Sequence, residues 1–335
     1  MRSVAVVIVI LLLAGLAQPI STPAQTPDAK DLLKAVVGVK AKLSPDDPST
    51  AELGVERSGS GVVIDAGGLV LTIGYIMRRA ETVRITLAGG RTVPAEVVGN
   101  DDDSGFGLLR ALEPLDIKPV RLGDTANLKE GDRVLAVSFA EQPDVTAARV
   151  FARHSYAGPW EYLIDNAIFT APVHQNFGGA ALLGEEGTLL GIGSLFVNVG
   201  EPIAMVPGNM FVPIDLLKPV MGDLLANKGQ TRSLRPWLGI RTKDSLGTVV
   251  VTSVVEGSPG AKAGIDTGDI IVGVKGKRVT TMVEFFRQAW ALGGPGTVVP
   301  LDIVRAKGTA VAIERVDVTA VDRNERYRSQ RKRGL

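Results

Sequence analysis

The residues able to do chemistry in this chain are few, and their types limit what that chemistry can be. The 335-residue sequence contains two histidines, His154 and His174, and no cysteine. The lack of cysteine excludes disulfides, thiol catalysis and zinc sites built on thiolates. His174 is a candidate general base for a hydroxyl such as Ser194 or Thr170, because an imidazole can take a proton at neutral pH. The competing interpretation is a solvated loop histidine, and His154 is expected to be a loop residue as well.

Three consecutive aspartates, residues 101–103, are a candidate cation site. A solvated turn explains them better, because a run of carboxylates alone does not make the caged oxygen site that a divalent cation requires. The two histidines lie twenty residues apart with no cysteine near them, which makes a weak case for metal. We therefore expect no metal and no cofactor.

The elements that must position these residues are predominantly short strands. Apolar segments flank glycine-containing turns at residues 66–68, 88–90 and 184–187, a pattern typical of β-hairpins. Residues 216–225 have apolar positions at helical spacing, and a polar linker follows at residues 228–235. Beyond it, strands are predicted at residues 239–242, 248–255, 270–274 and 298–304, with a helix at residues 283–292. The pattern favours an antiparallel barrel or sandwich followed by a second unit.

The two ends of the chain differ from the rest. Residues 1–24 form a charged start and an apolar run too short to cross a bilayer, which predicts a signal peptide cleaved near residue 17 or 24. An uncleaved membrane anchor is the alternative. Residues 321–335 form a basic tail that is either solvated or in weak contact with anionic lipid. The whole chain has 37 basic and 36 acidic residues, which does not favour nucleic-acid binding.

The order of the segments resembles that of the HtrA-like serine proteases, exported bacterial enzymes with a trypsin-like double barrel and one or more PDZ domains. The resemblance covers about residues 31–318. Its motifs are Gly59-Ser60-Gly61-Val62-Val63-Ile64-Asp65, Leu71-Thr72, Val97-Val98-Gly99-Asn100-Asp101, Leu122-Gly123-Asp124, Gly131-Asp132-Arg133-Val134, Asn176, Gly178-Gly179 and Asn209-Met210-Phe211-Val212-Pro213-Ile214. It implies a mostly β fold with a trypsin-like domain at residues 25–233 and a PDZ domain at residues 234–320.

The chain departs from this family where the catalytic triad is expected. The motifs align Tyr75 with the family's histidine, Gly105 with its aspartate and Phe177 with its serine. A phenol with a pKa near 10 cannot deprotonate a serine at neutral pH, and phenylalanine has no nucleophilic atom. Gln175 also replaces a glycine whose N–H helps to form the family's oxyanion hole. These departures predict that no residue at the three positions is catalytic and that the chain is not an enzyme.

Residues 237–240, Trp237-Leu238-Gly239-Ile240, resemble the carboxylate-binding loop of PDZ domains, and we call them the carboxylate loop. In that family, consecutive N–H groups bind a terminal carboxylate, and the peptide adds as a strand beside the loop. The predicted peptide site consists of Trp237, Leu238, Gly239, Ile240, Arg241, Phe285 and Ala289. One face of the helix at residues 283–292 is expected to line a pocket for the ligand's last side chain.

These observations predict a periplasmic or secreted scaffold, an inactive homologue of HtrA-like proteases that binds C-terminal or unfolded segments of envelope proteins. Two alternatives remain open. One is an active serine endopeptidase of envelope quality control with a rearranged site. The other is a regulatory subunit of an active relative. The chain is also a candidate for homo-oligomers or for hetero-assembly with such a relative, with membrane contact only through an uncleaved signal or the basic tail.

Overall fold

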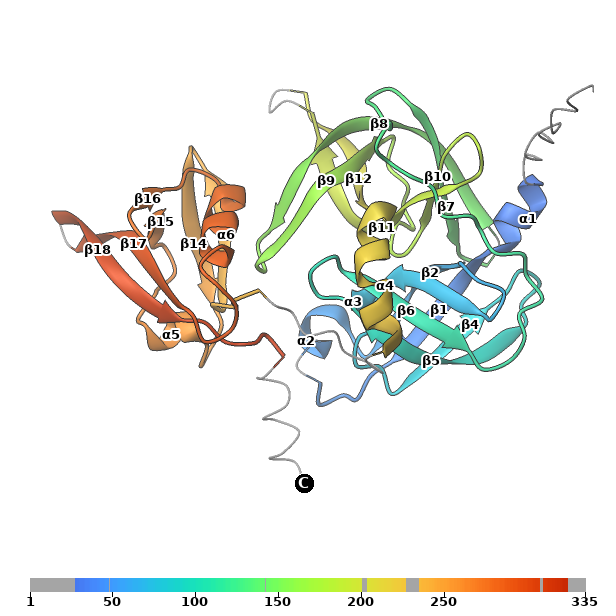
Figure 1. Ribbon diagram of the computed structural model, residues 1–335, viewed down its shortest axis with the longest axis horizontal. Coiled ribbons are helices and arrows are strands. Elements are labelled where there is room, and N and C mark those ends of the chain that lie inside the picture. The colour runs from blue at the N-terminus through green and yellow to red at the C-terminus, as the bar shows by residue number, and fades with distance from the viewer. Residues whose placement is uncertain are drawn as a thin grey trace, which may run out of the picture.

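The computed structural model describes residues 28–47, 49–141, 143–200, 204–226, 235–307 and 310–324. The predicted signal peptide, residues 1–24, lies outside the described residues. The fold is mostly β, as the sequence predicts, with two closed barrels followed by an open sheet (Figure 1). Within the described part of the chain, no helix is both long and apolar enough to cross a membrane.

Six antiparallel strands close the first barrel in the order β1-β2-β3-β6-β5-β4. They are β1 (Val36–Lys42), β2 (Glu56–Val63), β3 (Leu69–Ile73), β4 (Thr82–Thr86), β5 (Thr92–Asn100) and β6 (Phe106–Ala111). The alternation of apolar and polar residues places valine, leucine and isoleucine side chains inside, and β3 is buried at every position. A short helix, α3 (Gly74–Met77), follows β3 directly and begins the first candidate site segment.

The second barrel has the strand order β10-β11-β12-β9-β8-β7. Its strands are β7 (Arg133–Phe139), β8 (Pro143–Gly158), β9 (Tyr162–Ala171), β10 (Ala181–Leu183), β11 (Leu189–Val199) and β12 (Val206–Pro213). Strands β8 and β9 pair as far as Gly158 and Tyr162. Their hairpin extends from the barrel toward the C-terminal sheet (Figure 1). We call Pro159, Trp160 and Glu161 the hairpin tip.

The remaining helices of this part are short. They are α1 (Ala29–Lys34), α2 (Thr50–Leu53), the 3-10 turn η1 (Ile214–Leu216) and α4 (Leu217–Ala226). Helix α4 buries Leu217 and Leu224 and packs against β5 of the first barrel. It therefore ties the end of the second barrel to the first.

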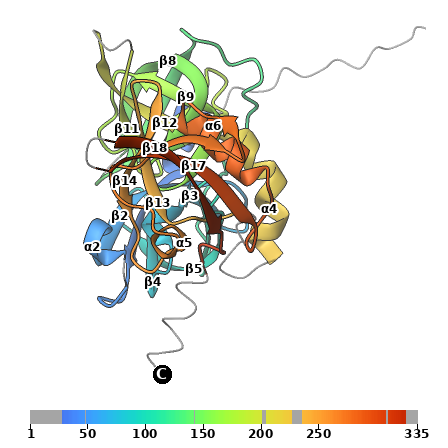
Figure 2. The same cartoon turned by 90° about the vertical axis from the view of Figure 1, so that its left-hand side faces the viewer.

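The C-terminal unit, residues 235–324 with the gap noted above, is one six-stranded sheet and two helices. The elements are β13 (Ile240–Ser245), β14 (Thr248–Val254), α5 (Pro259–Lys262), β15 (Ile270–Val274), β16 (Lys277–Arg278), α6 (Met282–Trp290), β17 (Val298–Lys307) and β18 (Ala310–Thr319). Strand β13 is an edge strand. Figure 2 views the molecule from the side of this sheet.

The expectation that one face of helix α6 lines a pocket for a ligand's last side chain stays a prediction. Phe285 and Ala289, which were expected on one face, are 0% and 1% exposed, and Phe286, from the other face, is 1% exposed. The reason is that α6 packs against β13 and β15 and also against β8 of the barrel. Phe285 and Ala289 are therefore buried where α6 meets the sheet and the barrel.

Candidate functional site

The segment of Tyr75 lies between the two barrels. Its hydroxyl donates a 3.0 Å hydrogen bond to the carbonyl oxygen of Ser194 on β11. A Cβ atom added to Gly178 would lie 2.9 Å from the same hydroxyl, so Tyr75 also approaches the loop that carries Phe177. Burial raises the pKa of Tyr75. The phenol is thus neutral at physiological pH and a hydrogen-bond donor, not a base.

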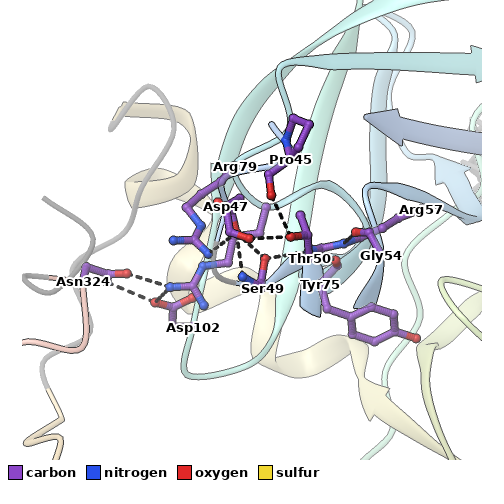
Figure 3. Close-up of polar contacts among 11 residues, drawn as sticks. Pro45, Asp47, Ser49, Thr50, Gly54, Arg57, Tyr75, Arg79, Asp102 and Asn324 are labelled. Carbon is purple, nitrogen blue, oxygen red and sulfur yellow. Dashed lines mark hydrogen bonds and ion pairs between the residues drawn. The ribbon is translucent and has the colours of Figure 1, made fainter. Parts of the chain in front are cut away.

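A polar network fixes the backbone of this segment (Figure 3). The guanidinium of Arg57 donates to the Tyr75 carbonyl oxygen at 2.7 Å and to Ser49 Oγ at 2.6 Å. Ser49 Oγ in turn donates to Asp47 Oδ1 at 2.5 Å, and Arg79 pairs with Asp47 at 2.7 Å. Because Arg57 is 8% exposed, it holds the α3 turn from inside the fold.

Gly105 lies beside the same turn and has a positive φ of 82°. Its carbonyl oxygen accepts a 2.7 Å hydrogen bond from the N–H of Gly74. The hydroxyl of Tyr162 fills the space next to it, because a Cβ at position 105 would lie 2.9 Å from Tyr162 Oη. Tyr162 donates a 2.8 Å hydrogen bond to the Ser104 carbonyl oxygen, and burial raises its pKa. A tyrosine from the second barrel thus occupies the place a residue-105 side chain would take.

Phe177 is half-buried and lies on the loop before β10. Its carbonyl oxygen accepts a 3.0 Å hydrogen bond from the N–H of Ala180, and the next carbonyl, of Gly178, accepts one from Ser60 at 2.8 Å. The structure therefore brings the segments of Tyr75, Gly105 and Phe177 together. The side chains gathered there include the phenols of Tyr75 and Tyr162 and the Ser194 side chain, which hydrogen-bonds Tyr162.

His174 is a buried residue, which excludes the solvated-loop interpretation. It is 1% exposed. Its Nε2 lies 2.8 Å from Ser138 Oγ, and its Nδ1 lies 2.8 Å from Thr146 Oγ1. The expected partners, Ser194 and Thr170, do not hold it: Thr170 Oγ1 is buried without a hydrogen bond. Burial lowers the pKa of His174, with Asp144 acting in the opposite direction.

The other polar candidates have structural partners. His154 lies on β8, not in a loop, and stacks on Phe169 with ring centroids 4.2 Å apart. Asp101 accepts a 2.5 Å hydrogen bond from Ser104 Oγ, and Asp102 pairs with Arg78 at 3.2 Å. No group of three or more metal-ligating side chains is found among the described residues.

The carboxylate loop has the geometry expected of an anion site. Gly239 has a positive φ of 74°, and a Cβ there would lie 2.2 Å from Ser258 Cβ, so the turn requires glycine. The N–H groups of Leu238, Gly239 and Ile240 point to one place and donate to the carboxylate of Glu161 at 2.9, 2.6 and 3.1 Å. Arg241, the next predicted residue, is half-buried on β13.

Glu161 comes from the hairpin tip of the second barrel. It is 3% exposed and has a left-handed backbone with φ of 57°. Burial raises its pKa, while Arg323 and the three N–H donors act to lower it. Leu163, two residues on, is 5% exposed and belongs to the apolar cluster of the C-terminal unit, with Leu238, Ile240 and Phe285. The hairpin is therefore packed into the predicted peptide site.

Sequence reasoning missed Glu161, Tyr162 and Ser138. The first two have no local signal, because a glutamate and a tyrosine next to a turn are ordinary in sequence. Ser138 lies near the end of β7, and only the barrel closure brings it to His174. The carboxylate loop was found because its pattern of small and apolar residues is local.

Comparisons with known proteins agree with this architecture. Residues 59–192 match the family of trypsin-like peptidase domains, and residues 250–305 match the PDZ domain family. The periplasmic pH-dependent serine endoprotease DegQ of Escherichia coli is 30% identical over 78% of this chain and 59% of its own length. The serine protease Do-like HtrA of Bacillus subtilis is 26% identical over 82% of this chain and 69% of its own.

Solved structures share the fold. The serine endoprotease from Yersinia pestis has a TM-score of 0.53 at 25% identity, over 88% of this chain and 96% of its own. The HtrA-type protease AlgW with decapeptide has a TM-score of 0.55 at 21% identity, over 88% and 97%.

These relatives contradict the prediction that the chain is not an enzyme, because they are named as serine endoproteases or serine proteases. That prediction relied on the side chains at the three triad positions and on Gln175 at the expected oxyanion hole. The chain spans 59% of the Escherichia coli relative and 53% of a DegP-like relative from Pseudomonas fulva.

The fold and the comparisons lead to one conclusion. The chain has two barrels, a carboxylate loop at the edge of an open sheet, and matches to both families. The chain carries a trypsin-like peptidase domain followed by a PDZ domain and is homologous to the HtrA and DegP serine proteases.

Proposed function

We propose that the chain is a periplasmic serine endopeptidase of envelope protein quality control whose hydrolytic site is rearranged. The homology to serine endoproteases supports the activity, and periplasmic relatives support the location. Residues 1–24 are the signal that exports it, residues 25–233 form the peptidase domain and residues 234–320 the PDZ domain. Its substrates are unfolded or C-terminal segments of envelope proteins.

The rearrangement follows from the residues at the expected triad. We assign Tyr75, Gly105 and Phe177 to the histidine, aspartate and serine positions of the relatives. Neither a phenol with a raised pKa nor a benzyl side chain can start an acyl transfer. Peptide hydrolysis by this chain therefore requires a different hydroxyl and a different base.

The observation that carries the proposal is the contact between His174 and Ser138. The two hydrogen bonds of the imidazole, 2.8 Å to Ser138 Oγ and 2.8 Å to Thr146 Oγ1, link a nucleophile, a base and an orienting group. The lowered pKa keeps His174 neutral near pH 7, as a base must be. In this assignment, Ser138 Oγ attacks the peptide carbonyl carbon, and its proton passes to His174 Nε2 and then to the leaving amine as the C–N bond breaks. Water, deprotonated by the same imidazole, then hydrolyses the Ser138 ester and restores the hydroxyl.

A substrate can reach Ser138 and His174 only if part of the loop between β9 and β10 moves. Ser138 is 0% exposed and His174 is 1% exposed, whereas Pro172, Gln175 and Asn176 on the same loop are exposed. Moving the later part of the loop, residues 175–180, would uncover the pair, while the 2.7 Å hydrogen bond from the His174 N–H to Asn209 Oδ1 holds the imidazole in place. The proposal thus predicts that hydrolysis is slow until a substrate or a partner opens this loop.

Turnover of unfolded casein by the purified chain tests the proposal. Ser138→Ala and His174→Gln should each lower the rate at least a hundredfold, while Ser44→Ala, far from the pair in sequence, should not change it. A serine-directed phosphonate should label Ser138, as located by mass spectrometry. Wild-type turnover no faster than that of Ser138→Ala would contradict the proposal.

A further inference from the structure

The carboxylate loop of this chain is already occupied by a carboxylate of the same chain. Leu238, Gly239 and Ile240 give all three convergent N–H groups to Glu161, at 2.6 to 3.1 Å. A protein C-terminus would need the same donors, because the loop offers one anion position. We infer that the hairpin tip is a built-in ligand of the PDZ groove. A partner chain with a free C-terminal carboxylate on an apolar last residue displaces it.

The hairpin matches a peptide ligand at more than the carboxylate. The N–H of Thr242, on the edge strand β13, donates to the Pro159 carbonyl oxygen at 3.3 Å. An incoming strand would form a hydrogen bond of this kind. Leu163 enters the apolar cluster of the PDZ domain, where a ligand's last side chain would be buried. The partner is therefore expected to end in an apolar residue such as valine or leucine.

The backbone of the hairpin tip is held in an uncommon conformation for this contact. Glu161 has a φ of 57°, a left-handed value that side-chain-bearing residues rarely adopt. Arg323 fixes it by donating to the carbonyl oxygens of Trp160 at 3.0 Å and Glu161 at 2.6 Å. Arg323 follows the last strand of the PDZ domain. The hairpin tip is therefore bound both by the carboxylate loop at the start of that domain and by Arg323 at its end.

The hairpin makes further contacts with the C-terminal unit, so the tip can leave the carboxylate loop and return to it as one unit. Arg287 on α6 pairs with Asp165 on β9 at 2.5 Å, and both side chains are more than half exposed. Arg235 donates to the Leu163 carbonyl oxygen at 3.3 Å and stacks over Trp290. An exposed ion pair contributes little to stability, so the buried Glu161 contact is the main lock of this interface.

Displacement would also reach the candidate site in the barrels. Tyr162 follows Glu161 directly, and its hydroxyl bonds to Ser104 beside Gly105. A shift of the tip changes the position of Tyr162 and hence of the Gly105 turn. Peptide capture by the PDZ domain is in this way coupled to the cleft between the barrels. This inference relies on the proposed function only for the binding of C-termini.

Binding of a labelled peptide with a free C-terminal valine tests the inference in the full chain. Glu161→Gly removes the carboxylate and suits the left-handed φ, so the turn keeps its backbone. It should bind the peptide at least tenfold more tightly than wild type, by fluorescence anisotropy. Glu186→Ala, at an exposed loop of the second barrel, should bind as wild type does, and an amidated peptide should bind poorly to all three.

A second measurement needs no ligand. Because the chain has no cysteine, spin labels can be placed at Lys118→Cys and Leu246→Cys, one exposed residue in each part. The interspin distance distribution should broaden or shift with Glu161→Gly, and with peptide added to wild type. Equal affinity of wild type and Glu161→Gly, with unchanged distances, would overturn self-occupancy but leave peptide binding intact. Failure of both proteins to bind would overturn peptide recognition itself, and this inference with it.

Discussion

Glu161 and Tyr162 are consecutive residues whose side chains enter different parts of the molecule. Glu161 accepts hydrogen bonds from the carboxylate loop, and Tyr162 donates to Ser104 in the first barrel. A residue pair at the end of one hairpin thus joins the PDZ domain, the second barrel and the first barrel. A substitution of either residue should therefore perturb all three parts.

The space beside Gly105 provides the first prediction. Gly105→Ala should destabilise the fold by about 1–2 kcal/mol, because a side chain at φ of 82° is strained and its Cβ would lie 2.9 Å from Tyr162 Oη. Tyr162→Phe removes that oxygen but leaves the buried Ser104 carbonyl without its donor, at about 1–2 kcal/mol. In the double variant the two costs should not add, and urea unfolding of the four proteins measures the coupling. Strict additivity would show that the two residues do not share this space.

The barrels and the sheet could be predicted from the sequence because their information is local. Alternating apolar residues and glycine turns determine β1 to β6 without reference to distant contacts. The carboxylate loop was found for the same reason, since the glycine at position 239 is required by the turn itself. The trypsin-like and PDZ resemblance therefore gave the correct fold.

The site could not be predicted in full because its contacts join distant segments. Glu161 lies 78 residues before Gly239 in sequence, and His174 lies 36 residues after Ser138. One face of helix α6 was expected to line a peptide pocket, and the sequence could not show that this helix also packs against β8 of the barrel. The prediction of inactivity considered the expected triad and oxyanion hole, and the relatives' names contradict it.

His174 gives the fold a pH dependence with a defined sign. Because burial lowers its pKa, the folded chain binds a proton less readily than the unfolded chain. Stability is therefore full above the unfolded-state pKa of about 6.5 and is lost as pH falls from that value through the lowered pKa of the folded chain. Wild type should lose more stability between pH 7.5 and 5 than His174→Gln, by denaturant midpoints. Parallel pH profiles for the two proteins would contradict this assignment.

The PDZ domain contains a largely buried ion pair, Arg305–Asp269, and a more exposed one, Arg315–Asp302, that serves as its control. Arg305 binds Asp269 through Nε at 3.0 Å and Nη2 at 2.9 Å, and Asp269 is 6% exposed. Arg305→Ala should cost about 3 kcal/mol, because it leaves Asp269 buried and unpaired. Arg315→Ala removes a mostly exposed partner of Asp302 and should cost less than about 1 kcal/mol. Thermal unfolding distinguishes the two, and equal losses would contradict the burial argument.

Asn324 joins the end of the PDZ domain to the first barrel (Figure 3). It accepts from Arg78 at 2.7 Å and donates to Asp102 at 3.0 Å. Asn324→Ala removes both hydrogen bonds, but Arg78 and Asp102 stay paired at 3.2 Å, so neither charge is left without a partner. Losing these bonds weakens the contact between the PDZ domain and the first barrel. It also frees the neighbouring residue Arg323, which donates to the Glu161 carbonyl oxygen in the hairpin tip. If docking loses about 1 kcal/mol, a peptide with a free C-terminal valine should bind roughly fivefold more tightly. Anisotropy measures this, with Asn198→Ala on β11 as the control. An affinity equal to that of wild type would mean that this contact does not oppose peptide binding.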